Sequence, residues 1–305
     1  MLARMDATPP IPGPTPATIA RALNEQGFLF QNRIVGLAWD ERDASKWHPE
    51  AFEYPVSIGL FHDETRIDLV LRCTVPATSA WYITVEAKRS HPDYKAWVFF
   101  ERRSRLLGLE KSEFSFQAAD YQRPDPRKFY DGLPPLQSRV MRIGNATEIP
   151  VFAYYVEARE NQKNKQSSNS ATTKIEEAFL QVTLGVIGLS GVLRGCRQQP
   201  FRIVPVVVTT AEIFAADYLA EDVDQRKGMI DPAKLKLQSL PWVAVNYAIN
   251  DKIAGERANA APPEGLLTAD LGGRLLRTVF VVQAESFMEL LTKLRVEFAE
   301  KNPQA

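Results

Sequence analysis

The chain has 305 residues, of which 45% are hydrophobic and 24% charged, and its equal numbers of acidic and basic residues give no formal net charge. This length supports a substantial core in one elaborated domain or two small ones, and the composition is that of a soluble globular protein. The neutral balance excludes binding to polyanions through overall charge, so any contact with nucleic acid must come from a local patch.

The cysteines and histidines indicate reduced thiols and no zinc site. Cys73 and Cys196 lie far apart in apolar surroundings, which predicts buried thiols in a cytoplasmic protein. His48, His62 and His91 do not have the spacing of a zinc site. No signal peptide is visible and no apolar run reaches about 18 residues, so neither a membrane partner nor export is expected.

The N-terminal part is predicted to begin with a tail and a helix. Residues 1–14 are rich in proline and are predicted to be disordered. Thr15-Pro16 is a typical helix start, and Gly27 ends that helix. Three segments follow, predicted as a strand, a polar loop, and a further strand or crossing segment: residues 28–39, 40–53 and 54–60.

The next two predicted strands carry a cluster of charged residues. Residues 66–72 and 81–89 are rich in β-branched and aromatic side chains, and the turn-forming residues between them indicate a hairpin. Strand side chains alternate between faces, so Glu86 and Lys88 project from one face, and the hairpin brings Asp68 beside them. The sequence therefore predicts two carboxylates and one ammonium at one edge of the sheet.

Such a cluster has two interpretations. Two carboxylates a few ångströms apart repel each other, and a divalent cation relieves the repulsion. Mg²⁺ usually takes one or two protein carboxylates together with substrate phosphate, and a lysine beside it can orient a water or stabilise developing charge. The alternative is a surface salt bridge between Glu86 and Lys88, because charged pairs on a strand face are common.

The order of these residues resembles the PD-(D/E)xK nuclease superfamily. Ile67-Asp68 on one strand and Glu86-Ala87-Lys88 at the end of the next match its motif, with Ile67 in place of the usual proline. The core of that superfamily runs helix, three-stranded meander, helix, strand, and the chain can be laid over this order from about residue 15 to 220.

The resemblance implies a fold and a domain plan. The expected fold is α/β, with a restriction-endonuclease-like core in which helices flank a mixed central β-sheet. Residues 15–305 would form a single elaborated domain. It would carry a long insertion after the third core strand, at 89–172, and a C-terminal extension at 220–305.

The resemblance also implies roles for the motif residues. Asp68, Glu86 and the carbonyl of Ala87 would hold Mg²⁺ or Mn²⁺, and Lys88 would position or activate the attacking water. Gln181, a polar residue in the middle of a long apolar helix, matches a helical Gln that touches the metal-site water or substrate in some members. Some members carry a further metal-linked Glu on the first helix, but Glu25 is interpreted as a solvated surface residue.

Basic residues after the motif form candidate contacts with nucleic acid. They are Arg89, Lys95, Arg102, Arg103 and Arg105, interleaved with Tyr94, Trp97, Phe99 and Phe100, and Lys163 and Lys165 in a polar loop at 159–173. Aromatic rings can stack on bases while basic groups hold phosphates. A satellite hydrophobic cluster with basic side chains lying along it, and a plain solvated loop, explain the same pattern.

The remaining elements complete an α/β pattern. Thr173 and Glu176 form a capping box for a helix over 174–194, in which Gly185, Gly188 and Gly191 allow close packing on a sheet. Pro205 argues for an edge or bulge in the strand over 201–208. The other predicted strands and the terminal helix are at 151–156, 213–218, 242–247, 277–282 and 284–301.

The function expected from the sequence is hydrolysis of phosphodiester bonds in DNA, rather than RNA, by a metal-dependent endonuclease of a bacterial restriction, phage-defence or repair system. Two alternatives remain at this point. One is a non-catalytic module for nucleic-acid binding or complex assembly on the same scaffold, and the other is an unrelated α/β protein. Nucleases of this superfamily often dimerise, so a homodimer and a partner subunit of a multi-protein system are both open.

Overall fold

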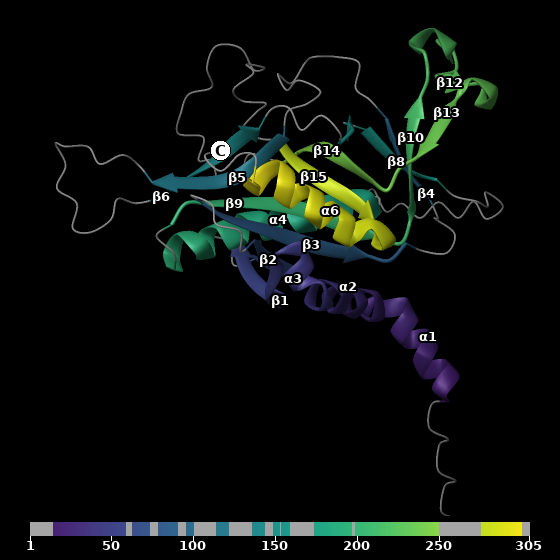
Figure 1. Ribbon diagram of the computed structural model, residues 1–305. Coiled ribbons are helices and arrows are strands. Elements are labelled where there is room, and N and C mark those ends of the chain that lie inside the picture. The colour runs from purple at the N-terminus through teal and green to yellow at the C-terminus, as the bar shows by residue number, and fades with distance from the viewer. Residues whose placement is uncertain are drawn as a thin grey trace, which may run out of the picture.

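A computed structural model of the protein (Figure 1) describes residues 15–58, 63–73, 79–90, 96–100, 114–121, 136–143, 149–152, 154–158, 174–196, 199–249 and 276–300. Within these residues the chain is an α/β structure whose mixed central sheet has helices on both faces. The predictions for the tail at 1–14, for the cap at Thr173 and for the loop at 159–173 lie outside the described residues.

The main sheet of the described chain has nine strands: β1 (Trp47–Ile58), β2 (Asp63–Cys73), β3 (Ala80–Lys88), β5 (Phe114–Tyr121), β6 (Leu136–Ile143), β7 (Val151–Phe152), β9 (Phe201–Thr209), β14 (Trp242–Ala248) and β15 (Leu276–Gln283). The order is β1-β2-β3-β9-β15-β14-β7, and β5 joins β9 to β6. The first three strands form an antiparallel meander, and β9 runs parallel to both β3 and β15.

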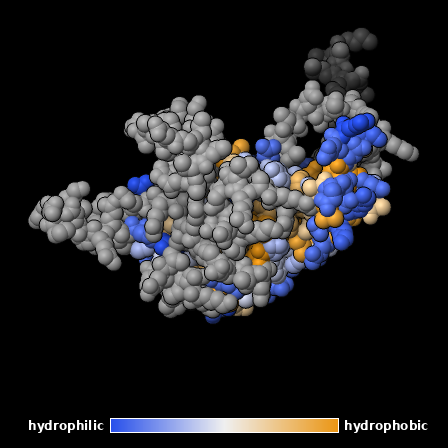
Figure 2. Space-filling model, turned by 90° about the horizontal axis from the view of Figure 1, so that it is seen from above, coloured by the Kyte–Doolittle hydropathy of each residue, from blue (hydrophilic) through white to orange (hydrophobic). Residues whose placement is uncertain are grey.

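A smaller sheet stands beside the main one, with the strands β4 (Ala96–Phe100), β8 (Tyr154–Ala158), β10 (Glu212–Asp217) and β13 (Lys236–Ser239) in the order β13-β10-β4-β8. A short hairpin of β11 (Val223–Asp224) and β12 (Met229–Ile230) extends from it. This end, at the right of Figure 2, is mostly hydrophilic, with hydrophobic residues interspersed.

The helices are α1 (Pro16–Gln26), α2 (Phe28–Asp40), α3 (Arg42–Ser45), α4 (Lys174–Cys196), α6 (Phe287–Leu294) with a π-helical end (Arg295–Glu300), and 3-10 turns at Ala220–Asp222, Pro232–Lys234 and Ala284–Ser286. Side chains of α2 and α6 share one hydrophobic cluster on the main sheet, and those of α4 pack on the other face. Helix α1 continues away from the body (Figure 1) and is exposed over residues 16–24.

Residues 28–39 form helix α2, so the strand predicted there is wrong. Ile34 and Ala38 are buried and Phe30 packs against the same cluster, so the core positions recur every fourth residue. This is the period of a helix. Burial of this stripe against the sheet outweighs the β propensity of the aromatic and β-branched residues.

The prediction of a loop at 40–53 is also wrong. This segment contains α3 and the first part of β1. The indole of Trp47 in β1 donates a hydrogen bond to the carbonyl of Leu291 at 2.8 Å. Its polar composition fits an edge strand, because β1 has a strand neighbour on one side only. Phe52 on this strand is 69% exposed.

The insertion after β3 contributes strands to both sheets. Strands β5 and β6 extend the main sheet, whereas β4 and β8 belong to the smaller one. The single strand predicted at 151–156 is therefore divided between β7 and β8, which lie in different sheets.

Pro205 lies inside the main sheet, in the central strand β9, and not at an edge. On one side it pairs with Thr84 of β3. On the other side the neighbour changes at this point, from antiparallel β5 over residues 201–203 to parallel β15 over residues 206–209. Proline has no N–H to donate to a neighbouring strand. Strand β9 tolerates it at this position because the pairing with β5 has ended and the pairing with β15 has not yet begun.

Helix α4 confirms the predicted helix and most of its close packing. A Cβ added to Gly188 would lie 2.5 Å from Val56, and one added to Gly185 would lie 3.0 Å from Ile67. Gly191 has open space around it, so its predicted packing role is wrong. The helix is also long and apolar enough to cross a membrane, which the sequence did not suggest. However, 56% of its most apolar window is buried inside the protein, as in the core helix of a soluble domain.

The other predicted elements agree with the structure. Strands β9, β10, β14 and β15 cover the segments at 201–208, 213–218, 242–247 and 277–282, and the helix at 284–301 appears as a 3-10 turn, α6 and a π-helical end. Cys73 is a buried free thiol, as predicted, whereas the side chain of Cys196 lies outside the described residues.

Candidate functional site

The β2–β3 hairpin brings Asp68 and Glu86 together, as predicted. Leu69 pairs with Val85, which places Asp68 opposite Glu86, and the N–H of Ala87 donates a hydrogen bond to Asp68 Oδ2 at 2.7 Å. The two strands are interior to the sheet and not at its edge. The cluster instead lies near the end of β3, where the chain leaves the sheet.

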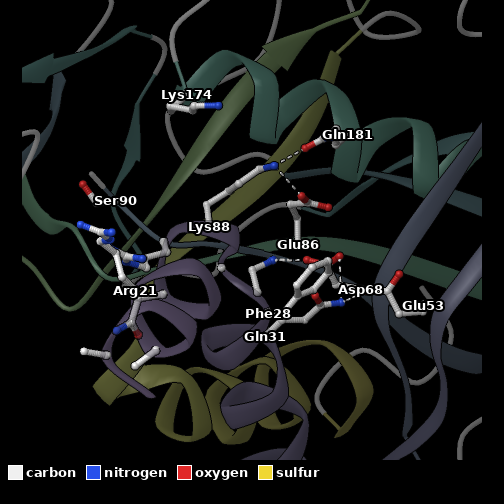
Figure 3. A pocket seen from close by; sticks show the side chains of 16 residues that line it. Arg21, Phe28, Gln31, Glu53, Asp68, Glu86, Lys88, Ser90, Lys174 and Gln181 are labelled. Carbon is white, nitrogen blue, oxygen red and sulfur yellow. Dashed lines mark hydrogen bonds and ion pairs between the residues drawn. The ribbon is translucent and has the colours of Figure 1, made fainter. Parts of the chain in front are cut away.

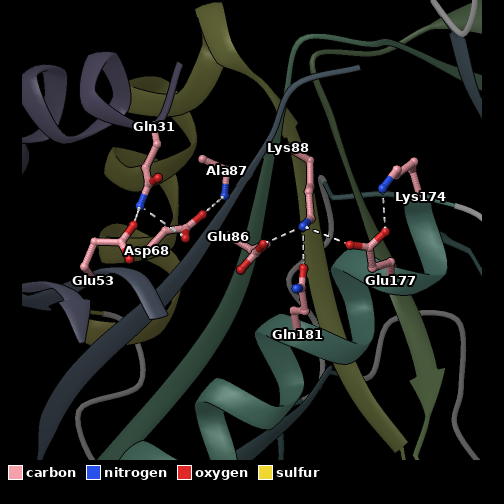
Figure 4. Close-up of polar contacts among 9 residues, drawn as sticks. All are labelled: Gln31, Glu53, Asp68, Glu86, Ala87, Lys88, Lys174, Glu177 and Gln181. Atoms are coloured by element: carbon pink, nitrogen blue, oxygen red, sulfur yellow. Dashed lines mark hydrogen bonds and ion pairs between the residues drawn. The ribbon is translucent and has the colours of Figure 1, made fainter. Parts of the chain in front are cut away.

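Lys88 is held on the α4 side of this cluster (Figure 4). Its Nζ lies 2.9 Å from Glu86 Oε1 and 3.6 Å from Glu177 Oε1, and it donates a hydrogen bond to Gln181 Oε1. Gln181 therefore finds its polar partner in Lys88. The ion pair between Glu86 and Lys88 exists, but its side chains are only 8% and 19% exposed. The interpretation as a solvated surface salt bridge is wrong.

Asp68 is held on the opposite side by residues that the sequence did not suggest. Gln31 of α2 donates a hydrogen bond from Nε2 to Asp68 Oδ1 at 3.3 Å and a second one to Glu53 Oε1. Glu53 stands opposite Asp68 in β1 and has a φ of 47°, in the left-handed region. Such a conformation in a residue with a side chain costs about 1–3 kcal/mol. In this conformation the Glu53 carboxylate accepts the hydrogen bond from Gln31.

Burial makes both motif carboxylates weak acids. The pKa of Asp68 is raised to about 6. Desolvation is the largest cause and the charge of Glu53 adds to it, whereas the hydrogen bond from Ala87 opposes the shift. Desolvation together with the charge of Asp68 raises the pKa of Glu86 to about 7, although Lys88 opposes the shift. The two groups thus repel each other when both are ionised, which is the condition that a divalent cation relieves.

Lys88 stays protonated at neutral pH. Desolvation alone would lower its pKa, but the charges of Glu86, Glu177 and Asp68 together outweigh that effect and raise it above the ordinary value. Glu177 has a lowered pKa, because Lys174 donates a hydrogen bond to it and Lys88 adds a second positive charge. In the metal-free protein the lysine is therefore a cation.

An open groove of about 940 Å³ leads to this cluster (Figure 3). Its floor includes Asp68, Glu86 and Lys88. One wall is formed by α1 and the start of α2, and the other by the first two turns of α4. Asp68, Glu86 and Lys88 therefore line a groove that the described elements leave open.

The donor set fits a hard divalent cation. Asp68 and Glu86 supply carboxylate oxygens at the groove floor, and Ala87 lines the groove between them. Two carboxylates with room for water and a phosphate oxygen are the ligands that Mg²⁺ prefers. Among the described residues, no group of three or more His, Cys, Asp or Glu is arranged to hold a metal, so such an ion would depend on main-chain, water or substrate oxygens.

The predicted nucleic-acid contacts are only partly described. Arg89 is exposed and lines the groove. The interleaved Trp97 and Phe99 are buried in the core, 1% and 0% exposed, so they cannot stack on bases, and the satellite cluster is the correct interpretation for them. The other basic candidates lie outside the described residues: Lys95, Arg102, Arg103, Arg105, Lys163 and Lys165. Glu25 belongs to α1, but its side chain lies outside them too.

The functional residues missed by the sequence come from the N-terminal helices. Arg21, Phe28 and Gln31 line the groove. Phe28 and Gln31 were missed because α2 was predicted as a strand, and Arg21 was missed because no local pattern places α1 beside the β2–β3 hairpin. The helical spacing of Phe30, Ile34 and Ala38 is the signal that could have placed Gln31 towards the sheet. No local signal identifies Glu53, because its approach to Asp68 depends on an irregular backbone.

Comparison with known proteins identifies no relative. No family model, no curated protein and no solved structure matches the chain.

Proposed function

We propose that the protein is a divalent-metal-dependent nuclease that hydrolyses phosphodiester bonds of DNA, with a restriction-endonuclease-like core. One observation carries the proposal: a buried and a half-buried carboxylate, both with raised pKa values, lie beside a protonated lysine at the floor of an open groove. Strongly perturbed titratable groups gathered in a cleft are typical of functional sites. The meander β1–β3, helix α4 and the parallel strand β9 follow the order of that superfamily core.

Each side chain would have a separate task. Asp68 and Glu86 would hold Mg²⁺ or Mn²⁺ together with the main chain at Ala87, and the ion would supply charge stabilisation and a bound water of lowered pKa. Because Lys88 is protonated, it would orient the attacking water or a phosphate oxygen by donating a hydrogen bond. Gln181 accepts from Lys88 and would fix the direction of its ammonium group.

The cellular location and process that we propose follow from the same activity. A soluble domain without net charge and with a local catalytic groove is consistent with a cytoplasmic enzyme that binds DNA through local contacts. Restriction, phage defence and repair are the bacterial processes that need such a reaction, and a second copy of the chain would allow cleavage of both strands.

Cleavage of supercoiled plasmid and of linear single strands tests the proposal. The wild type, Glu86→Ala and Glu212→Ala are incubated with Mg²⁺, Mn²⁺ or EDTA. Glu212 is an exposed residue of β10 outside the groove and serves as a matched control. The proposal expects metal-dependent cleavage by the wild type and Glu212→Ala, and none by Glu86→Ala. Mn²⁺ binding without cleavage of any substrate would instead favour a non-catalytic binding module.

A further inference from the structure

An aromatic ring and two arginines share the groove with the carboxylates. Phe28, at the start of α2, lines the groove and is 54% exposed, although large aromatic side chains are usually buried. It lies one helical turn from Gln31, whose side chain contacts Asp68, so its ring is next to the reactive groups (Figure 3). Nothing in the core packing accounts for its place there, because Phe28 belongs to none of the hydrophobic clusters.

The same wall carries positive charge. Arg21 projects from α1 into the groove, and Arg89 follows β3 at its rim. Neither guanidinium group pairs with a carboxylate among the described residues. The α1 positions that line the groove, Ala17, Ala20, Arg21 and Asn24, recur at helical spacing, so one face of this helix is directed at the groove.

We infer that the groove binds single-stranded nucleic acid, with a base stacked on Phe28 and an adjacent phosphate held by Arg21. Proteins that bind single strands combine a positively charged groove with aromatic side chains on which bases stack. In a duplex, neighbouring base pairs cover the faces of each base, so a stacking side chain requires an unpaired or flipped base. This inference names the substrate class of the proposed nuclease and rests on that function.

The geometry assigns different tasks to the two residues. Stacking on Phe28 is indifferent to the identity of the base, because every base has a π-face. Arg21 contacts phosphate and therefore adds affinity that falls as salt rises. Together they would place the phosphodiester bond beside the stacked base over Asp68 and Glu86.

The experiment measures binding in EDTA, so that no cleavage occurs. Fluorescence anisotropy is recorded for a labelled oligothymidylate of about 20 nucleotides and for a duplex of the same length, a size that exceeds one single-strand site. The variants at the stacking position are Phe28→Leu and Phe28→Tyr, with Phe52→Leu as a control at an exposed phenylalanine outside the groove. Arg21→Gln is compared with Arg33→Gln, an exposed arginine of α2 that does not line the groove.

The inference expects the wild type to bind the single strand more tightly than the duplex. Phe28→Leu should weaken single-strand binding about tenfold, Phe28→Tyr should restore it, and the duplex affinity should not change. Arg21→Gln should reduce the slope of log K against log salt by about 0.7, as expected for one lost phosphate contact on a single strand. Both control variants should bind as the wild type does.

Two results would overturn the inference: equal affinity for single strand and duplex, or single-strand binding that survives Phe28→Leu. Its failure is separable from failure of the nuclease proposal. A protein that cleaves DNA with Mn²⁺ through Glu86, but binds the single strand equally well with or without the Phe28 ring, is a nuclease that does not stack bases on Phe28. A protein that never cuts, but loses single-strand binding in Phe28→Leu, binds as inferred without the proposed activity.

Discussion

The two walls of the groove are built differently. On the α4 side the helix backbone lies against β1 and β2, since Gly188 and Gly185 leave no room for a side chain, and Lys88 is fixed by three acceptors. On the opposite side α1 is exposed over residues 16–24 and carries Arg21 into the groove. In the proposed nuclease, the groups that need accurate placement would lie on the packed wall and the groups that contact nucleic acid on the open one.

The largest expected effect concerns the packed wall. Lys88→Met keeps the aliphatic stem but removes the charge that would stabilise the transition state, so cleavage should fall about 10²- to 10³-fold. Mn²⁺ binding at pH 8.5 should persist, because this pH lies above the wild-type pKa values of about 6 and 7, and the bound ion would replace the positive charge lost from Lys88. Lys174→Met, which removes an exposed cation paired with Glu177, is the control and should lose less than tenfold. Equal losses in the two variants would contradict a special role for Lys88.

The raised pKa values predict how the metal-free protein responds to pH. The folded state keeps protons on Asp68 and Glu86 up to about pH 6 and 7, whereas the unfolded chain releases them near its ordinary values of 3.8 and 4.5. The stability from this pair is therefore fully present below about pH 4 and is lost as pH rises through 6 and 7. In EDTA at pH 8, Glu86→Gln should raise the free energy of unfolding by about 1–3 kcal/mol.

Chemical denaturation of the two proteins at pH 4 and pH 8 measures this effect. The variant should differ from the wild type at pH 8 and much less at pH 4, and Mn²⁺ should stabilise only the wild type at pH 8. A variant that is less stable than the wild type at pH 8 would show that the buried, ionised carboxylate of Glu86 does not destabilise the folded state.

Close packing of α4 gives the next prediction. Gly188→Ala places a Cβ 2.5 Å from Val56, so the helix must move away from β1, at a cost of about 1–3 kcal/mol. Gly191→Ala has open space on the same helix and should stabilise the protein by about 0.5–1 kcal/mol. Thermal unfolding of both variants measures the difference, and similar shifts of the same sign would mean that α4 is not closely packed.

The smallest expected effect concerns the open wall. Gly27 joins α1 to α2 with a φ of 77° and has no neighbouring atom within 4 Å, so Gly27→Ala should cost about 1 kcal/mol through backbone strain alone. Gly36→Ala, inside α2 and equally free of neighbours, should instead gain about 0.5–1 kcal/mol. Denaturant titrations compare the two. Stabilisation by Gly27→Ala would show that the two helices are continuous in solution.

The part of the site that could be predicted from the sequence is the part that depends on strand alternation. Glu86 and Lys88 share a face because they are two residues apart, and the hairpin register brings Asp68 opposite Glu86. Gln181 could be singled out because a polar side chain in an apolar helix needs a partner. These inferences require only the periodicity of strands and helices and the turn that joins β2 to β3.

The other half of the site depends on tertiary packing. Phe28, Phe30 and Ile34 have the β propensity of a strand, and only their burial against the sheet shows that they lie on a helix. Trp97 and Phe99 lie in a short apolar run flanked by basic residues, yet the packing of the smaller sheet buries both of them. The approach of Glu53 to Asp68 follows from a left-handed residue that no sequence pattern marks.

Calorimetric titration of the protein with Mn²⁺ at pH 8, without nucleic acid, tests the central claim most directly. The wild type and the Glu212→Ala control should bind Mn²⁺ and release few protons, because the carboxylates are already ionised at this pH. Asp68→Asn and Glu86→Gln should each lose most of that affinity, because each removes one of the two carboxylates that would bind the ion. Mn²⁺ affinity that is equal in all four proteins would contradict the account.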